Sequence, residues 1–405
     1  MALVRAFRAV RPARESAAAV SSVPYDIVST DEARELAAGN PLSFLHVTRS
    51  EIDLPPGTEP YASEVYAKAR ESFDLLRKNA PMLTEDSPSL YFYRLRMGGH
   101  EQTGLAACFS VDEYERDLIK KHERTRRDKE DDRTRHIIEL RAQTGVVFLT
   151  YKDDPVVERL SRAITADVPL YDFRADDGVH HTIWRAPARE ATELVDVFAR
   201  IPALYIADGH HRAASAARAR AELRSQGGAG EADAFIAVAF PDSQMNILPY
   251  NRIVKDLAGQ TPAQFLETLR RRLPLRDGGA RPGRQGEAAM YLDGRWYTID
   301  LSGATPADGS RAQSLDVALL EHHVLGPLLK IGDIRTDKRI DFVGGARGTA
   351  ALEQAVGNGR AAVAFSMHPV TIEDLMAIAD EGGIMPPKST WFEPKLRDGL
   401  LVHTV

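Results

Sequence analysis

The fold interpretation rests on residues 203–225, ALYIADGHHRAASAARARAELRS. The first five residues, 203–207, are mostly apolar and predict a buried strand, whereas the alanine- and arginine-rich residues 212–225 predict a helix. Gly209 lies between them and permits a tight turn, because glycine has no side chain to clash. A strand that passes through a short turn into a helix is typical of an α/β fold.

The sequence on either side of this stretch also alternates between strand and helix patterns, with a hairpin turn at Asp293-Gly294. The fold class we predict is therefore mixed α/β. We expect strands at 90–95, 103–109, 146–151 and 235–240, and helices at 31–38, 61–79, 155–165 and 262–273.

The chain has 405 residues, which at roughly 100–200 residues per domain predicts two or three domains. We expect three regions. Residues 1–110 form an N-terminal α/β region, residues 111–260 form a candidate nucleotide- or phosphate-binding core that contains the Gly209 turn, and residues 261–405 form a C-terminal α/β region.

Composition excludes several classes of protein. The formal net charge is -6, whereas general nucleic-acid binders carry a basic excess, so we expect no nucleic-acid partner. No run of about 18 apolar residues is present, and we expect no membrane partner. The single cysteine, Cys108, cannot form an internal disulfide, which fits a reducing compartment. We therefore predict a cytoplasmic protein; the sequence leaves a homo-oligomer open.

A highly charged segment, residues 120–136, contains no aliphatic or aromatic residue apart from histidines. One interpretation is a surface helix whose charges of both signs are solvated and stabilised by i,i+4 pairs. The other is a functional segment. Glu123 beside cations would stay ionised and could act as a general base toward an alcohol, while Lys121, His122 and Thr125 could contact the phosphates of a nucleotide.

The turn at Asp208–Arg212 is the sharpest candidate site. The N-terminus of the following helix presents backbone N–H groups and a positive dipole end, and His210, His211 and Arg212 add donors suited to phosphate oxygens. Asp208 could hold a metal ion or a substrate hydroxyl. A capping turn with surface histidines is the alternative. A metal site made of both histidines and Asp208 is disfavoured, because adjacent histidines on a helix point apart.

A third candidate is the run Met385–Lys395, in which two prolines stiffen the approach to Lys388, Ser389 and Thr390. This run could face an anion, or it could form a structural edge with a buried Trp391-Phe392 pair. The stretch Val343–Gly348 has a strand followed by glycines but matches neither the Rossmann fingerprint nor the Walker loop.

Several of these blocks together resemble the signature blocks of the domain-of-unknown-function 1015 family, and the resemblance runs nearly from end to end. The blocks are Pro24–Val28, Asn40–His46, Lys121–Thr125, Ala207–Arg212, Arg335–Gly345 and Met385–Lys395.

That family is similar to the free-serine kinases (SerK) of the ParB/sulfiredoxin-like fold. The resemblance implies a ParB/sulfiredoxin-like nucleotide-binding core with additional α/β elements at both ends. It further implies a kinase that phosphorylates free L-serine, or a related hydroxyl metabolite, using ATP or ADP with magnesium.

The roles we expect follow from this resemblance and from the chemistry of phosphoryl transfer. Asp208 holds the metal or the hydroxyl, and His211 acts in catalysis. Glu123 is nominated as the base upstream of the turn. The nucleotide is contacted by Gly209, His210, Arg212, Lys121, His122, Thr125 and Lys388.

Two other classes of function stay open. One is a nucleotide-dependent binding or regulatory protein, because ParB relatives use the same turn to bind CTP and clamp DNA. The negative net charge and the lack of a clear basic helix-turn-helix count against DNA. The other is a metal-dependent hydrolase that uses the histidine pair.

Overall fold

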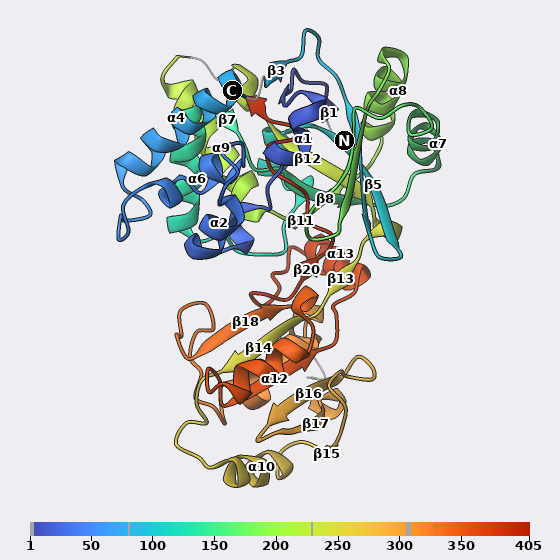
Figure 1. Cartoon of the computed structure of the whole chain (residues 1–405). Coiled ribbons are helices and arrows are strands. Elements are labelled where there is room, and N and C mark those ends of the chain that lie inside the picture. The colour runs from blue at the N-terminus through green and yellow to red at the C-terminus, as the bar shows by residue number, and fades with distance from the viewer. Residues whose placement is uncertain (1–3, 80–81, 228–229, 305–308) are drawn as a thin grey trace. The chain divides into compact units, whose positions relative to one another are not determined.

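The computed structural model describes residues 4–79, 82–227, 230–304 and 309–405 (Figure 1). The chain divides into two compact units. Unit 1 comprises residues 1–121, 125–245 and 394–405, and unit 2 comprises residues 122–124 and 246–393. The first two regions expected from the sequence thus share one unit, and the division expected near residue 260 falls after residue 245. The end of the chain belongs to unit 1.

Unit 1 is built on a nine-stranded mixed sheet with the order β6-β11-β8-β12-β5-β4-β10-β9, and β1 pairs with β5. The pairs β6–β11 and β8–β12 are parallel and the others are antiparallel. This confirms the mixed α/β class. The strands are β1 (Val4–Arg5), β4 (Tyr91–Met97), β5 (His100–Ser110), β6 (Ile119–Lys120), β8 (Val147–Tyr151), β9 (Tyr171–Arg174), β10 (His180–Arg185), β11 (Leu204–Asp208) and β12 (Ala234–Pro241).

Two small sheets join distant segments of unit 1: β2 pairs with β3, and β7 pairs with β21 at the C-terminus. Their bounds are β2 (Val10–Arg11), β3 (Leu83–Thr84), β7 (Ala142–Gln143) and β21 (His403–Thr404). The helices are α1 (Ala17–Val20), α2 (Thr30–Ala37), α3 (Leu45–Thr48), α4 (Ser63–Asn79), α5 (Val111–Glu115), α6 (Arg127–Leu140), α7 (Pro155–Ile164), α8 (Ala188–Phe198) and α9 (His210–Ser225).

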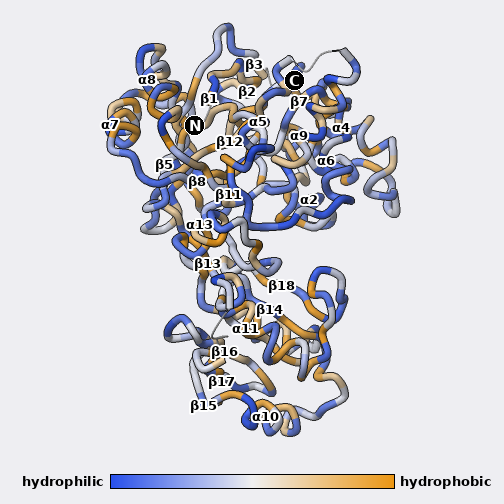
Figure 2. Tube along the Cα trace, turned by 180° about the vertical axis from the view of Figure 1, so that it is seen from behind, coloured by the Kyte–Doolittle hydropathy of each residue, from blue (hydrophilic) through white to orange (hydrophobic). Residues whose placement is uncertain are grey.

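The main hydrophobic core of unit 1 lies between the sheet and its helices. Figure 2 shows hydrophobic and hydrophilic residues along both α7 and α8. The apolar residues of each helix enter the core, including Leu160 of α7 and Phe198 of α8. Helix α9 contributes alanines instead, among them Ala213 and Ala216, and such small side chains let a helix pack closely. The amphipathic patterns thus explain which helix faces are buried.

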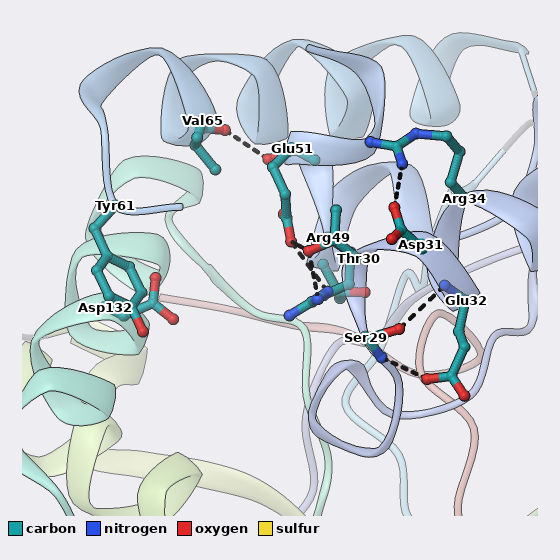
Figure 3. A network of polar contacts seen from close by, with 12 residues as sticks. Ser29, Thr30, Asp31, Glu32, Arg34, Arg49, Glu51, Tyr61, Val65 and Asp132 are labelled. Carbon is teal, nitrogen blue, oxygen red and sulfur yellow. Dashed lines mark hydrogen bonds and ion pairs between the residues drawn. The ribbon is translucent and has the colours of Figure 1, made fainter. Parts of the chain in front are cut away.

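The N-terminal helices are held by local polar contacts (Figure 3). A capping box begins α2: the Glu32 N–H donates to the Ser29 hydroxyl (3.2 Å), and the Ser29 N–H donates to the Glu32 carboxylate (2.8 Å). Arg49 donates to Thr30 (3.0 Å) and pairs with Glu51 (3.1 Å). These contacts fasten α2 to the chain that follows α3.

The prediction of one surface helix over residues 120–136 is wrong. Lys120 lies in β6, residues 121–126 are irregular, and α6 begins at Arg127. One face of α6 is buried because its polar groups find partners: Asp132 accepts from the Tyr66 hydroxyl (2.8 Å). Burial lowers the pKa of His136 to about 4, and its Nε2–H donates to the Val47 carbonyl (3.0 Å).

Unit 2 contains an antiparallel six-stranded sheet with the order β15-β17-β16-β19-β14-β18, and β13 pairs with β20. The predicted hairpin turn is confirmed: Asp293 and Gly294, at φ 49° and 77°, join β16 to β17. The elements are β13 (Ile247–Leu248), β14 (Tyr250–Val254), α10 (Pro262–Arg270), β15 (Leu275–Asp277), β16 (Glu287–Leu292), β17 (Arg295–Asp300), α11 (Asp316–Leu320), β18 (Ile340–Gly344), α12 (Ala350–Gly357), β19 (Val363–Met367), α13 (Ile372–Asp380) and β20 (Trp391–Phe392).

No helix in the described ranges is long and apolar enough to cross a membrane.

Close packing at Gly104 in β5 gives a test of the unit 1 sheet. A Cβ at Gly104 would lie 2.7 Å from the Val238 side chain and 2.8 Å from the Ala239 carbonyl, so Gly104→Ala should destabilise the protein by about 2 kcal/mol. Gly99, in the hairpin that begins β5, has nothing within 4 Å of such a Cβ, and Gly99→Ala should change stability by less than about 0.5 kcal/mol. Urea unfolding of both variants measures this difference, and equal stabilities would contradict the packing described.

Candidate functional site

The turn between β11 and α9 follows from a bulge and a glycine. The pairing of β11 with β8 shifts register between Ile206 and Asp208, which interrupts the ladder where the strand ends. Gly209 then adopts a left-handed conformation (φ 96°, ψ 30°) and forms the N-cap of α9. A glycine N-cap has no side chain to cap the first turn of the helix, and that first turn contains no acidic residue. No side chain of its own first turn therefore neutralises the positive end of α9, and the nearest carboxylate along the chain is Asp208, directly before the N-cap.

A second helix begins at the same place. The backbone N–H of Arg126, the N-cap of α6, donates to Nε2 of His211 in the first turn of α9 (2.9 Å). One turn further on, the Ser215 hydroxyl of α9 donates to the Glu130 carbonyl of α6 (3.2 Å). The two helices thus run parallel with their N-termini together. Arg126 makes no capping hydrogen bond with its side chain, so both positive dipole ends meet at one point.

The contact with Arg126 fixes the state of His211. A backbone N–H can only donate, so Nε2 of His211 accepts and carries no proton. The neutral ring therefore holds its proton on Nδ1, which leaves that atom as its donor.

Asp208 is the carboxylate at the end of β11. Its Oδ2 lies 3.0 Å from Nζ of Lys395 and 3.8 Å from Nη2 of Arg212. Burial alone would raise the pKa of Asp208, but the two cations outweigh burial and hold it well below its ordinary range. Asp208 is therefore ionised at neutral pH and bound to two cations, one four residues and the other 187 residues further along the chain.

Arg212 connects the turn to the N-terminal segment. It donates through Nη1 to the Val146 carbonyl and through Nη2 to Asp26 (2.9 Å), and its side chain is 6% exposed. Burial lowers the pKa of Arg212, but Asp26 and Asp208 raise it further, so the guanidinium stays charged. Two of the three guanidinium nitrogens thus donate to groups of this same chain. The expected contact of Arg212 with a nucleotide stays a prediction.

A small cavity in unit 1 lies beside this guanidinium, lined by residues that include Tyr25, Arg133, Gly145 and Arg212. The cavity has room for about one water molecule. Within the described ranges, Nε of Arg212 has no hydrogen-bond partner. An ordered water is the occupant that fits this volume and this donor.

The other predicted residues divide between the two units. In unit 1, His210 is buried, the Thr125 hydroxyl donates to Glu130, and Nζ of Lys121 donates to the Tyr114 carbonyl (2.7 Å).

His122, Glu123 and Lys388 belong to unit 2. There the His122 carbonyl accepts from the Met385 N–H (2.9 Å), and Nζ of Lys388 lies 5.3 Å from the centre of the Tyr250 ring. The roles expected for His122, Glu123 and Lys388 stay predictions.

Three residues that build the site were not among the site residues expected from the sequence: Asp26, Arg126 and Lys395. Lys395 and Asp208 are 187 positions apart, so no periodicity or spacing links them. The one available signal is that Asp26 and Lys395 both lie in signature blocks. Arg126 contributes its backbone N–H, which a sequence does not specify.

The structure also bears on metal binding. Within residues 4–79, 82–227, 230–304 and 309–405, no three His, Cys, Asp or Glu side chains gather as a transition-metal site would require. A magnesium ion needs only one or two carboxylates when it binds together with phosphates. The expected metal role of Asp208 therefore stays a prediction.

The chain belongs to a family of proteins of unknown function, DUF1015, whose family model matches residues 4–318. No curated protein matches the chain.

Three solved structures are similar to the chain at low identity. SbnI with a C-terminal truncation, from Staphylococcus aureus, is 14% identical, with 74% of this chain and 87% of that chain covered and a TM-score of 0.40. A free serine kinase in complex with AMP is 12% identical, with coverages of 73% and 91% and a TM-score of 0.36. A conserved hypothetical protein from Pyrococcus furiosus is 14% identical, with coverages of 74% and 95% and a TM-score of 0.36.

Asp398 gives a pH test of the buried charges around Arg212. Burial raises its pKa to about 7 although Arg212 lowers it, and Oδ2 has no hydrogen-bond partner among the described residues. Because the unfolded carboxyl titrates near pH 4, the protein takes up a proton on folding between about pH 4 and 7. This contribution to stability is complete below pH 4 and is lost as pH rises through 7.

The stability of the natural protein relative to Asp398→Asn should therefore fall by more than about 1 kcal/mol between pH 5 and pH 8. Guanidinium unfolding across this range measures the difference. If the free energies of unfolding of the two proteins changed in parallel with pH, Asp398 would have the ordinary pKa of an aspartate, and the account of its burial would be wrong.

Proposed function

We propose that the chain is a nucleotide-dependent phosphotransferase that moves a phosphoryl group from ATP or ADP to the hydroxyl of a small metabolite, with free L-serine as the first candidate. The observation that carries the proposal is the meeting of the α6 and α9 N-termini, joined by the Arg126–His211 hydrogen bond, beside Asp208. The signature blocks resemble the domain-of-unknown-function 1015 family, and the similarity of that family to the free-serine kinases supports the same class.

Electrostatics favour a phosphate at this position. Each helix N-terminus carries about half a positive charge, and two such ends meet here without side-chain caps. The acidic residues in the first turn of α6 are already paired, Asp128 with Arg126 (2.7 Å) and Glu130 with Arg218 (3.0 Å). A polyphosphate placed here gains backbone donors, the Nδ1–H of His211 and the field of both helices.

Phosphoryl transfer needs positioning and charge neutralisation more than covalent chemistry from the protein. The acceptor oxygen forms a bond to the terminal phosphorus, the bond from that phosphorus to the bridging oxygen breaks, and the hydroxyl proton leaves to a base. Glu123 is our candidate for this base, and Asp208, which stays ionised, orients the hydroxyl or a metal. A magnesium ion would neutralise charge on the phosphates, and Lys121, Thr125 and Lys388 are further candidates for contacting the nucleotide.

A binding assay followed by a turnover assay tests the proposal. Isothermal titration calorimetry with ADP and with ATP, in magnesium and in EDTA, should detect one site per chain, and magnesium should tighten it. Phosphorus NMR with magnesium, the bound nucleotide and L-serine should then show a new phosphoserine resonance as nucleotide phosphate is lost. Binding without turnover of L-serine or of other hydroxyl amino acids would favour a nucleotide-dependent regulator, and the absence of binding would refute the proposal.

His211 provides the matched variants. His211→Ala removes the imidazole ring that links the two helix N-termini and that the proposal places against the nucleotide phosphates. Loss of a hydrogen bond to a charged ligand should weaken ADP binding at least about tenfold. His100, in the β4–β5 hairpin of the same unit, bonds Gln102 instead (3.1 Å), and His100→Ala should bind ADP as the natural protein does. Equal affinities for all three proteins would place the nucleotide elsewhere.

A further inference from the structure

Among the described residues, one buried arginine lacks the carboxylate partner that the other buried arginines have. The others form ion pairs: Arg212 with Asp26, Arg220 with Glu115, and Arg397 with Asp177. Arg252, in β14 of unit 2, is 1% exposed and forms no ion pair with any described residue. Burial lowers the pKa of Arg252 to about 10, which leaves the guanidinium charged at neutral pH. A buried charge without a partner is unfavourable for the protein alone.

The contacts of Arg252 leave one edge of its guanidinium without a partner. Nη1 donates to the Tyr250 carbonyl, and Cζ lies 5.6 Å from the centre of the Phe342 ring. Phe342 is the residue opposite Arg252 on β18, the strand beside β14 in Figure 1. In the part of the chain that the structure describes, Nε and Nη2 have no hydrogen-bond partner. These two nitrogens form an edge with which arginine binds a carboxylate through two parallel hydrogen bonds.

A carboxylate faces this guanidinium without pairing with it. Glu321 begins a π-helical turn, Glu321–Leu325, that directly follows α11. Burial raises the pKa of Glu321 although Arg252 lowers it, yet the two side chains form no ion pair. The Gly326 N–H donates to the Glu321 carbonyl (3.0 Å), five residues back along the chain. Turns of this kind are rare and are frequent at functional sites.

We infer that Arg252 and Glu321 form a binding site in unit 2 for a free α-amino acid, whose carboxylate binds the guanidinium and whose ammonium group binds Glu321. Two opposite charges that face each other without contact are complementary to a zwitterion. A simple anion would pair with Arg252 but would be repelled by Glu321. Because Glu321 is partly exposed, the ligand reaches Arg252 from the side of Glu321. The inference does not depend on the nucleotide site proposed in unit 1.

Stability separates this role of Arg252 from a structural one. If Arg252 served only to hold β14 and β18 together, Arg252→Met would destabilise the protein. Removing an unpaired buried charge should instead leave the urea midpoint unchanged or raise it. Arg220→Met is the matched control: Arg220 is also buried but is paired with Asp112 and Glu115, so its loss should lower the midpoint. An equal fall in both variants would overturn the inference.

Calorimetry on the full-length protein without nucleotide tests the binding itself. The standard L-amino acids are titrated one at a time, and at least one of them should bind. The tightest ligand should bind at least about tenfold more tightly than the same acid without its amino group. Arg252→Met and Glu321→Gln should each weaken its binding at least about tenfold, whereas Arg220→Met should stay within about twofold of the natural protein. Because Glu321 is partly exposed, Glu321→Gln should keep the fold.

The inference would be overturned if no amino acid bound, or if either Arg252→Met or Glu321→Gln kept the affinity of the natural protein. Equal affinity for the amino acid and for its analogue without the amino group would also overturn it. Binding that His211→Ala abolished and Arg252→Met retained would place the amino acid in unit 1 instead. Since no nucleotide is present, the two proposals fail separately: a protein that bound an amino acid but no ADP would refute the proposed function alone.

Discussion

The site depends on the ion pairs that the carboxylate of Asp208 forms. Asp208 ends β11, it faces Lys395 from the C-terminal segment, and it faces Arg212, which in turn holds Asp26 of the N-terminal segment. Three parts of the chain that are far apart in sequence thus meet at one buried set of charges. Such a set is stable only while every partner is present, because a single buried charge left unpaired costs several kcal/mol.

Two helix N-termini meet beside Asp208. A left-handed glycine at position 209 lets the chain turn directly from β11 into α9, and His211 then accepts from the Arg126 N–H at the start of α6. These two N-termini are the positive dipole ends on which the proposed phosphate site rests.

Much of the local structure could be predicted from the sequence. The turn from β11 to α9 and the hairpin at Asp293-Gly294 were predictable because backbone conformation there depends on adjacent residues. The buried face of α6 was not, since Asp132 becomes buried only because Tyr66 of α4 lies opposite. Lys395 was missed as a partner of Asp208 for the same reason: the C-terminal return of the chain to unit 1 is a tertiary event that no local pattern encodes.

The most direct measurement is hydrogen–deuterium exchange by mass spectrometry on the full chain with ADP and magnesium. The account predicts slower exchange in three peptides at once, those covering residues 125–130, 208–213 and 394–398. These peptides contain the first turns of α6 and α9 and the segment that holds Lys395. Protection confined to other parts of the chain, or no change on adding ADP, would contradict the claim that these two helix N-termini form a phosphate site.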